Sequence, residues 1–439
     1  MAGYPVFGLA VIGATPMASA MAIVALLFGP ADPPRTVLAV AGLDPIERQA
    51  RQARHAGAKR VYVLDGRRGY ASGMINLDNA AMLPPRLVDG DAVLVLAAGL
   101  VADEAIIDAV TAAAALAADN VLPAVATWPA ASGRCGVERI DALTFAAGVA
   151  VYPAALVRRV ALEIGDWDLS STLLRAALCE TACVRVDLAG SASPGANGRC
   201  RASLICALVT TPESAAAATA TVLAATARPR SDASGRYLYP AIERALLHSL
   251  APTRVHPHAI TATAGALGIA ATASFVAGAL WVGLACALLF GLLQELGERV
   301  AQAHVLRLRW RRWNIFAVAI GYSWWLALAL ALVPIRGNGG PLAVAALLLS
   351  AQVTAASEAR AVQRSPDNRA KSVRTTDHRT ALLTADRDGL ALLLVPFALA
   401  GQWYAGLIAL AAYAVGSFAV THARFLRRLA SSLLPPPTA

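Results

Sequence analysis

The apolar stretch of residues 259–294 constrains the chain more than any other feature because it contains no Asp, Glu, Lys or Arg. An apolar helix of about 20 residues already crosses the hydrocarbon core of a bilayer. Residues 259–294 are too long for one such helix and predict two, with a hinge near Ala277-Gly-Ala279. We therefore expect a protein that crosses the membrane more than once.

The composition of the whole chain agrees with a membrane protein. Hydrophobic residues make up 57% of it and charged residues only 15%, with a mean hydropathy of +0.56. The formal net charge of +10 comes mainly from arginines that stand beside the apolar spans. This placement favours topology signals and contacts with anionic headgroups, and it argues against binding of nucleic acid. The cysteines include no C-x-x-C pair, so we expect no disulfide framework.

Three further charge-free segments complete the membrane half. Residues 314–335 and 337–357 predict one span each, and residues 389–423 predict two spans hinged near Gly401-Gln-Trp403. Together with residues 259–294 they predict an all-α domain of six transmembrane helices, which we place within residues 259–430.

Arginine and lysine gather in two of the connections between these spans. Residues 299–312 and 360–387 are rich in arginine, and the second segment also contains Lys371, whereas the opposite loops carry only Arg336. Because positively charged loops stay in the cytoplasm, the basic loops and the soluble half are predicted to lie on the cytoplasmic side of a bacterial-type inner membrane.

The part of the chain before the membrane half is predicted to form a cytoplasmic α/β domain. Short apolar runs alternate there with helical charge spacing, which favours a parallel sheet covered on both faces. The expected strands are residues 36–41, 60–65, 92–97 and 121–127, and the expected helices include residues 45–55, 103–118 and 210–226.

The predicted domain boundaries follow from these patterns. Residues 1–31 carry no charge and form either a transmembrane helix or an apolar extension packed on the soluble domain, which occupies residues 32–227. Residues 228–258 contain a linker and then an amphipathic helix expected to lie in the membrane interface. Residues 431–439 are expected to be a disordered tail.

The soluble half contains a motif with a family resemblance. Ala41-Gly-Leu-Asp-Pro-Ile-Glu-Arg48 resembles the G-x-P-x-x-x-R stretch of sugar-nucleotide and CTP-dependent nucleotidyltransferases, but it lacks their phosphate-cradling glycines. The resemblance places Gly99 near the position of that family's metal-binding aspartate. It therefore implies a nucleotidyltransferase-like fold with a degenerate site. Asp103 and Asp141 remain as acidic candidates, either for cation binding or as cap and loop residues.

The membrane half resembles the CDP-alcohol phosphatidyltransferase family from Asp232 to the end of the chain. Val255-His-Pro-His-Ala-Ile-Thr261 is similar to the T-P-N-x-I-T stretch with which that family enters its first span. The resemblance implies a homodimer that transfers a phospho-alcohol group from a CDP-linked donor to an acceptor hydroxyl with Mg²⁺ or Mn²⁺, in the synthesis of phospholipids or related lipids. A similar order of domains occurs in enzymes that make a CDP-activated inositol and then transfer its phosphoinositol group.

The aspartates that carry this family's chemistry are missing. In the motif D-x-x-D-G-x-x-A-R, anchored on Gly297, Leu293 and Leu296 take the first two aspartate positions. Glu295 and Glu298 keep the i, i+3 spacing and would share one helix face. They are therefore the candidate metal ligands.

The remaining candidates lie beside these glutamates. Catalysis would use Glu295, Glu298 and His304, and the candidate phosphate-binding residues are Arg299, Arg307, Arg309 and Arg311. In the alternative interpretation, Glu295, Glu298 and Arg299 form a salt-bridge cluster, and the arginines that follow them set the membrane topology. Two functions follow, a phosphatidyltransferase-like enzyme or a catalytically inactive relative that binds lipid or nucleotide and scaffolds a partner enzyme.

Overall fold

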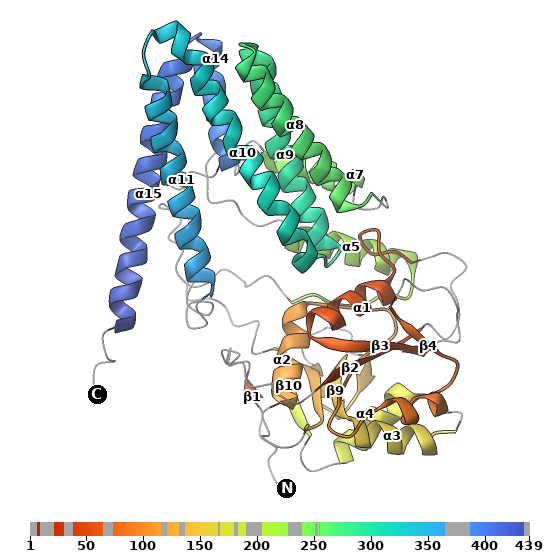
Figure 1. Cartoon of the computed structure of the whole chain (residues 1–439). Helices are drawn as coiled ribbons and strands as arrows, with labels where there is room; N and C mark the ends of the chain where they lie inside the picture. Colours follow the sequence, from red (N-terminus) through yellow and green to blue (C-terminus); the bar gives the residue numbers. More distant parts are fainter. Residues whose placement is uncertain are drawn as a thin grey trace. The chain divides into compact units, whose positions relative to one another are not determined.

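A computed structural model of the chain describes most of the predicted elements (Figure 1). The described residues are 7–8, 22–29, 38–64, 73–115, 121–130, 137–165, 167–179, 183–189, 204–226, 239–250, 253, 255–364 and 387–433. They divide into two compact units, residues 1–225 and 226–439, and each unit is described here by itself.

The first unit contains a mixed sheet that is mainly parallel. Its described strands run in the order β1-β10-β7-β9-β5-β2-β3-β4, with β8 beside β9. Only β9 is antiparallel to its neighbours β5, β7 and β8 among these pairs. The strands are β1 (Phe7–Gly8), β2 (Ile23–Phe28), β3 (Ala58–Leu64), β4 (Ile75–Leu77), β5 (Ala92–Leu96), β7 (Ala124–Pro129), β8 (Glu138–Arg139), β9 (Thr144–Pro153) and β10 (Val184–Asp187). A separate antiparallel ribbon joins β6 (Leu100–Ala102) to β11 (Cys206–Leu208).

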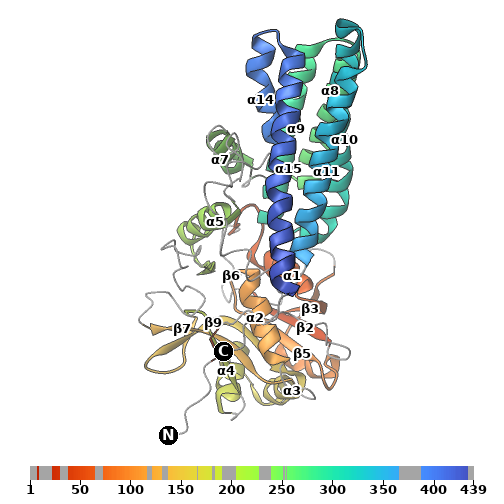
Figure 2. The same cartoon turned by 90° about the vertical axis from the view of Figure 1, so that its left-hand side faces the viewer.

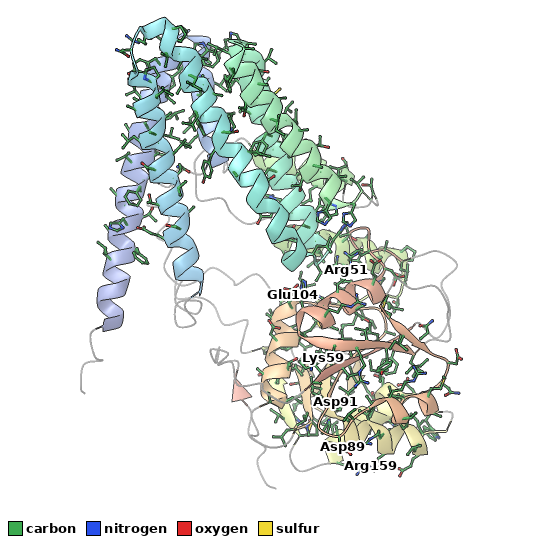
Figure 3. The ribbon with its side chains drawn as sticks, in the orientation of Figure 1. Arg51, Lys59, Asp89, Asp91, Glu104 and Arg159 are labelled. Atoms are coloured by element: carbon green, nitrogen blue, oxygen red, sulfur yellow. The ribbon has the colours of Figure 1, made fainter. Side chains whose placement is uncertain are left out.

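Helices cover both faces of this sheet. One apolar core contains side chains of α1 (Pro45–His55) and α2 (Glu104–Ala114), and the other contains side chains of α3 (Ala154–Glu163) and α4 (Leu169–Cys179). Arg51 and Glu104 project from α1 and α2, whereas Arg159 marks α3 on the opposite face (Figure 3). A fifth helix, α5, spans Pro212–Thr226, and short 3-10 turns cover Ala80–Met82 and Pro84–Arg86.

The structure corrects the prediction for the start of this unit. Residues 23–28, predicted to lie in an apolar extension or a transmembrane helix, form β2 between β3 and β5. Leu26 and Leu27 are completely buried and enter opposite cores. A strand buried on both faces reads as a continuous apolar run, which explains why the pattern resembled a membrane segment.

Two other sheet predictions also change. Residues 38–41, the described part of the strand predicted at 36–41, lead into a turn in which Val40 and Leu43 exchange backbone hydrogen bonds. The sheet is mixed because β9 enters it antiparallel, which the strand pattern did not indicate. The strands predicted at 60–65, 92–97 and 121–127 and the helix predicted at 45–55 are confirmed within a few residues.

The second unit is a bundle of helices. Five of them have apolar windows long enough to cross a membrane, at residues 257–276, 280–303, 319–336, 340–358 and 403–423. They belong to α8 (Pro257–Val276), α9 (Leu280–Ala303), α10 (Arg307–Arg336), α11 (Gly340–Arg364) and α15 (Trp403–Leu433). The hinges predicted near residues 277–279 and 401–403 are confirmed as the turns between α8 and α9 and before α15.

The predicted count of six spans is not confirmed, because the described residues contain five helices long enough to cross a membrane. The sixth candidate, α14 (Arg387–Leu399), has 13 residues and is about 20 Å long, whereas the hydrocarbon core is about 30 Å thick. The predicted amphipathic helix before the first span is present as α7 (Tyr239–Leu250), which packs against α9.

Small residues bring the bundle helices together, as membrane helices require. α8 packs against both α9 and α10, and α11 packs against α15 (Figure 2). A Cβ atom at Gly283 of α9 would lie 2.8 Å from the Phe275 ring, so this crossing needs glycine. Thr272 and Ser323 join α8 to α10 by a hydroxyl–hydroxyl hydrogen bond of 2.9 Å.

The two ends of the bundle differ in chemistry. One end contains the turns at residues 277–279, 337–339 and 400–402, where the Trp281 and Trp403 rings meet edge to face and Arg336 lies 4.5 Å above the Tyr404 ring. The other end contains the start of α8, the α9–α10 corner and the ends of α11 and α15. We call it the arginine-rich end because residues 307–312, 360–364 and 424–428 lie there.

The strand assignment of β2 predicts a large effect for Leu27→Ala. Removing this buried side chain should lower the free energy of unfolding of the first unit by about 2–5 kcal/mol. Pulse proteolysis of the full-length protein across a urea series measures this change, and Leu143→Ala at an exposed position is the control. Equal urea midpoints for the two variants would contradict a core strand at residues 23–28.

Candidate functional site

The strand order of the first unit reverses beside β2. The chain adds β3 and β4 on one side of β2 and then returns to place β5 on the other side. In open α/β sheets, ligands bind outside the carboxyl ends of the strands at such a point. The carboxyl end of β5, residues 97–99, is therefore the first place to look for a ligand site.

Side chains of α1 satisfy the backbone at this place. Gln49 Nε2 donates to the carbonyl oxygens of Ala97 and Leu100, each at 2.8 Å. Gln52 Nε2 donates to the carbonyl oxygen of Ala102 at 2.7 Å. Both glutamines are buried, so their amide N–H groups on this face of α1 are used in hydrogen bonds to the protein's own backbone.

Arg48, the arginine of the nucleotidyltransferase-like motif, is also buried. Its Nη2 donates to the carbonyl oxygen of Val40 at 3.2 Å. Burial, followed by the charge of Arg51, lowers the pKa of Arg48 to about 10, so the side chain stays cationic at neutral pH. Asp44 caps the same helix by accepting a hydrogen bond from Ile46 N at 2.8 Å. In this structure the motif holds α1 against the sheet.

Gly99 occupies a position that admits no side chain. Its φ is +68°, and a Cβ atom there would lie 2.4 Å from the carbonyl oxygen of Val209. Val209 N also donates to the carbonyl oxygen of Gly99 at 2.9 Å, which continues the pairing of β6 with β11. The place where the resemblance put a metal-binding aspartate is filled by backbone.

The two acidic candidates of the first unit lie in separate places with structural partners. Asp103 caps α2 by accepting from Ala105 N at 3.1 Å. Asp141 lies in the β8–β9 hairpin, accepts from Leu143 N at 2.9 Å and pairs with Arg185 at 2.8 Å. Desolvation acts to raise the pKa of Asp141, but its hydrogen bonds and the charge of Arg185 outweigh it, and the pKa is lowered.

The candidate glutamates of the second unit lie near the end of α9. Glu295 Oε1 accepts from Arg299 Nε at 3.1 Å, and the side chain of Arg299 is only 9% exposed. Glu298 Oε1 accepts from Gln302 Nε2 at 3.3 Å. Each glutamate is thus paired with a residue one turn further along the same helix, as in the salt-bridge interpretation of these residues.

The corner after α9 holds the other candidates. His304 is buried and ends α9, and the next residue, Val305, has a φ of +56°, which is strained for a β-branched side chain. Arg307, Arg309 and Arg311 lie in the first turns of α10, but their side chains fall outside the described part of the structure. The described side chains contain no group of three or more His, Cys, Asp or Glu that could hold a metal ion.

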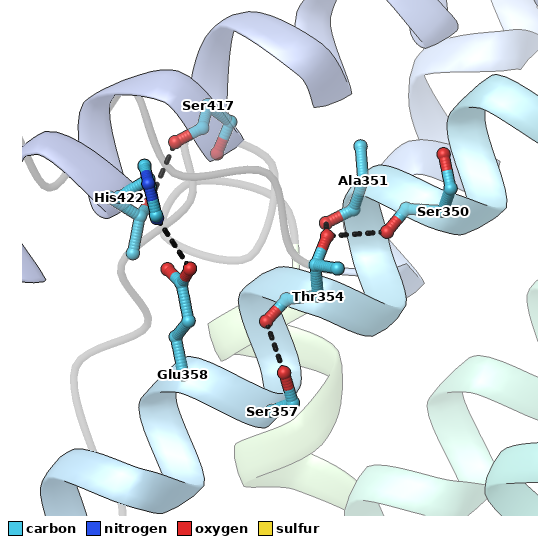
Figure 4. Close-up of polar contacts among 8 residues, drawn as sticks. Ser350, Ala351, Thr354, Ser357, Glu358, Ser417 and His422 are labelled. Carbon is cyan, nitrogen blue, oxygen red and sulfur yellow. Dashed lines mark hydrogen bonds and ion pairs between the residues drawn. The ribbon is translucent and has the colours of Figure 1, made fainter.

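A further ionisable pair joins α11 to α15 at the arginine-rich end (Figure 4). His422 Nδ1 lies 2.6 Å from Glu358 Oε1. The His422 ring stacks on Phe418 and Phe425, with ring centroids 5.3 and 6.5 Å apart. The sequence contained only a weak indication of this pair, because both residues lie at the ends of apolar spans. Their spacing in the sequence does not indicate that they meet.

No protein-family model and no curated protein matches this sequence. The resemblances to nucleotidyltransferases and to CDP-alcohol phosphatidyltransferases therefore rest on the motifs quoted above.

The packing of Gly99 predicts that Gly99→Ala is much more harmful than Gly90→Ala. Both glycines have positive φ angles, but no atom lies within 4 Å of a Cβ at Gly90. The alanine at 90 should cost only the backbone strain of about 1–2 kcal/mol, whereas the alanine at 99 must also displace the backbone of Val209. Pulse proteolysis of the two full-length variants measures the difference, and equal midpoints would contradict the close contact.

The lowered pKa of Asp141 predicts a pH-dependent effect of Asp141→Asn. An aspartate whose folded-state pKa lies below the unfolded value of about 3.9 stabilises the fold above that pH. This contribution is lost as the pH falls through the folded-state pKa. Because the side chain is 42% exposed, we expect less than about 1 kcal/mol at pH 7.

Urea unfolding at pH 7 and at pH 3 measures this effect, with the exposed Asp78→Asn as control. A loss of stability in Asp141→Asn that is the same at both pH values would contradict a role for the carboxylate charge.

Proposed function

We propose that this chain is a multi-pass membrane protein related to the CDP-alcohol phosphatidyltransferases that binds lipid and scaffolds a partner enzyme without catalysing phosphoalcohol transfer itself. The pairing of the two glutamates of α9 carries this proposal. Glu295 is held by Arg299 and Glu298 by Gln302, each within hydrogen-bond distance. Carboxylates held in this way stabilise the end of the helix.

A divalent cation beside these glutamates would need more oxygen ligands than the described residues supply. Mg²⁺ takes near-octahedral oxygen coordination, and Arg299 adds a positive charge beside Glu295. The described side chains supply these two glutamates and no third carboxylate to the same group. These residues therefore do not fit a Mg²⁺ or Mn²⁺ site, and we derive no transfer step through a metal.

The first unit supports a scaffolding role. Its sheet, parallel apart from β9 and with reversed strand order beside β2, is compatible with a nucleotidyltransferase-like fold. Gln49, Gln52 and the backbone around Gly99 fill the carboxyl end of β5. This packing favours an interaction domain over one that turns over a nucleotide.

The lipid partner and the location follow from charge. The arginine-rich end suits the cytoplasmic leaflet, whose anionic lipids attract basic segments next to the membrane. We therefore place the first unit in the cytoplasm and the bundle in a bacterial-type inner membrane, where the chain would form a homodimer, as the resemblance implies.

The transferase remains the second candidate because one observation favours it. Glu295 keeps 25% of its side chain exposed, and Glu298 follows it at i, i+3 on the same helix. A CDP-linked donor and an acceptor hydroxyl would then be the substrates.

Release of CMP separates the two candidates. The purified full-length protein, reconstituted in lipid, is incubated with a panel of CDP-alcohols and Mg²⁺ or Mn²⁺, beside a Glu295→Gln/Glu298→Gln double variant. We expect no metal-dependent CMP release from either protein. Gln302→Ala is the matched control, because it removes the hydrogen bond from Gln302 to Glu298 and keeps both carboxylates.

Metal-dependent release by the unmodified chain that the double variant abolishes would overturn the proposal and establish the transferase. The thermal midpoint of each variant shows whether a loss of release reflects misfolding.

A further inference from the structure

The Glu358–His422 pair has no part in the proposed glutamate site of α9. It lies where the apolar windows of α11 and α15 end, at residues 358 and 423. Ionisable side chains in membrane helices usually pair with one another, as these two do. The short contact of 2.6 Å and the stacking on Phe418 fix the position of the imidazole.

This pair presents an unmet hydrogen-bond acceptor. Glu358 Oε1 is engaged by His422 Nδ1, but Glu358 Oε2 is buried and has no hydrogen-bond partner within the described structure. A buried acceptor without a donor is unfavourable, because the oxygen has lost its hydration and gained no hydrogen bond. A ligand group that donates a hydrogen bond, such as a hydroxyl, would satisfy it.

The same place is rich in positive charge. Arg360 and Arg364 follow Glu358 within two turns of α11, and Arg424, Arg427 and Arg428 follow His422 within two turns of α15. Since Nδ1 of His422 is engaged by Glu358, Nε2 is the nitrogen left to meet a ligand. His422 keeps 42% of its side chain exposed, so a molecule at the membrane surface can reach it.

We propose that the ends of α11 and α15 bind the headgroup of an anionic phospholipid that carries a hydroxyl group. The phosphate lies against His422, and a headgroup hydroxyl donates to Glu358 Oε2. This assignment rests on the proposed function only in placing this end of the bundle at the membrane surface, and it names the class of lipid that the chain selects.

Native mass spectrometry of the full-length protein in detergent micelles tests the assignment with three lipids. Phosphatidylglycerol has a phosphate and headgroup hydroxyls, phosphatidic acid has a phosphate without an alcohol headgroup, and phosphatidylcholine has neither a net charge nor a donor. We expect phosphatidylglycerol to be retained about tenfold more tightly than phosphatidic acid, as one added hydrogen bond to a carboxylate would give, and phosphatidylcholine least.

Two variants separate the contributions of the pair. His422→Gln should weaken binding of both anionic lipids by severalfold, because the imidazole that faces the phosphate is lost. Glu358→Gln should remove the preference for phosphatidylglycerol over phosphatidic acid. In that variant the amide oxygen faces His422 Nδ1, so an amide N–H₂ replaces the acceptor. Ser357→Ala, at an exposed neighbour on α11, is the control and should change neither affinity.

Equal retention of phosphatidylglycerol and phosphatidic acid by the unmodified protein would overturn the proposal, whatever the variants do. Unchanged lipid binding in a His422→Gln protein with a normal thermal midpoint would also overturn it. The CMP assay reads a different property, so CMP release together with the expected lipid preference would reject the scaffold and keep this site.

Discussion

Backbone hydrogen bonding within apolar sequence is the constraint on which both halves of this protein depend. An apolar segment leaves water only if its N–H and C=O groups find partners inside the protein. Residues 23–28 find them in the neighbouring strands β3 and β5, whereas the residues of α8 and α9 find them within their own helices. The same apolar composition therefore produces a central strand in one unit and membrane-length helices in the other.

Polar side chains then decide what each unit can do chemically. At the carboxyl end of β5, Gln49 donates to backbone carbonyls, and at the end of α9, Arg299 holds Glu295. In both places the protein itself takes up the hydrogen-bonding capacity that a bound phosphate or metal would use. These internal pairings are the observations that support the proposed role as a lipid-binding scaffold. Glu358 Oε2 is buried without a donor in the described structure, as Gln49 Oε1 is, but Glu358 lies beside the partly exposed imidazole of His422, which a molecule at the membrane surface can reach.

A good part of the fold could be predicted from local pattern. Charge-free length indicated α8, α9, α10, α11 and α15, and the helical charge spacing of residues 45–55 indicated α1. The i, i+4 pairing of Glu295 with Arg299 was also within reach, because neighbours on one helix are set by its period. The location of β2 could not be predicted, because a strand buried on both faces lacks the alternation that distinguishes a strand from a membrane segment. The sixth span was predicted although the hinge near residues 401–403 leaves a segment after residue 389 that is shorter than the roughly 20 residues of a full span.

The sequence by itself determined that the chain has an α/β part and a multi-pass helical part, because apolar length and periodicity are local properties. Only the tertiary structure decided three further features: the antiparallel entry of β9, the filling of the carboxyl end of β5 around Gly99, and the meeting of Glu358 with His422. Each depends on residues far apart in the chain, such as Gly99 with Val209. No local pattern specifies such contacts, since they arise when helices and strands pack and each buried polar group takes the partner that the packing brings to it.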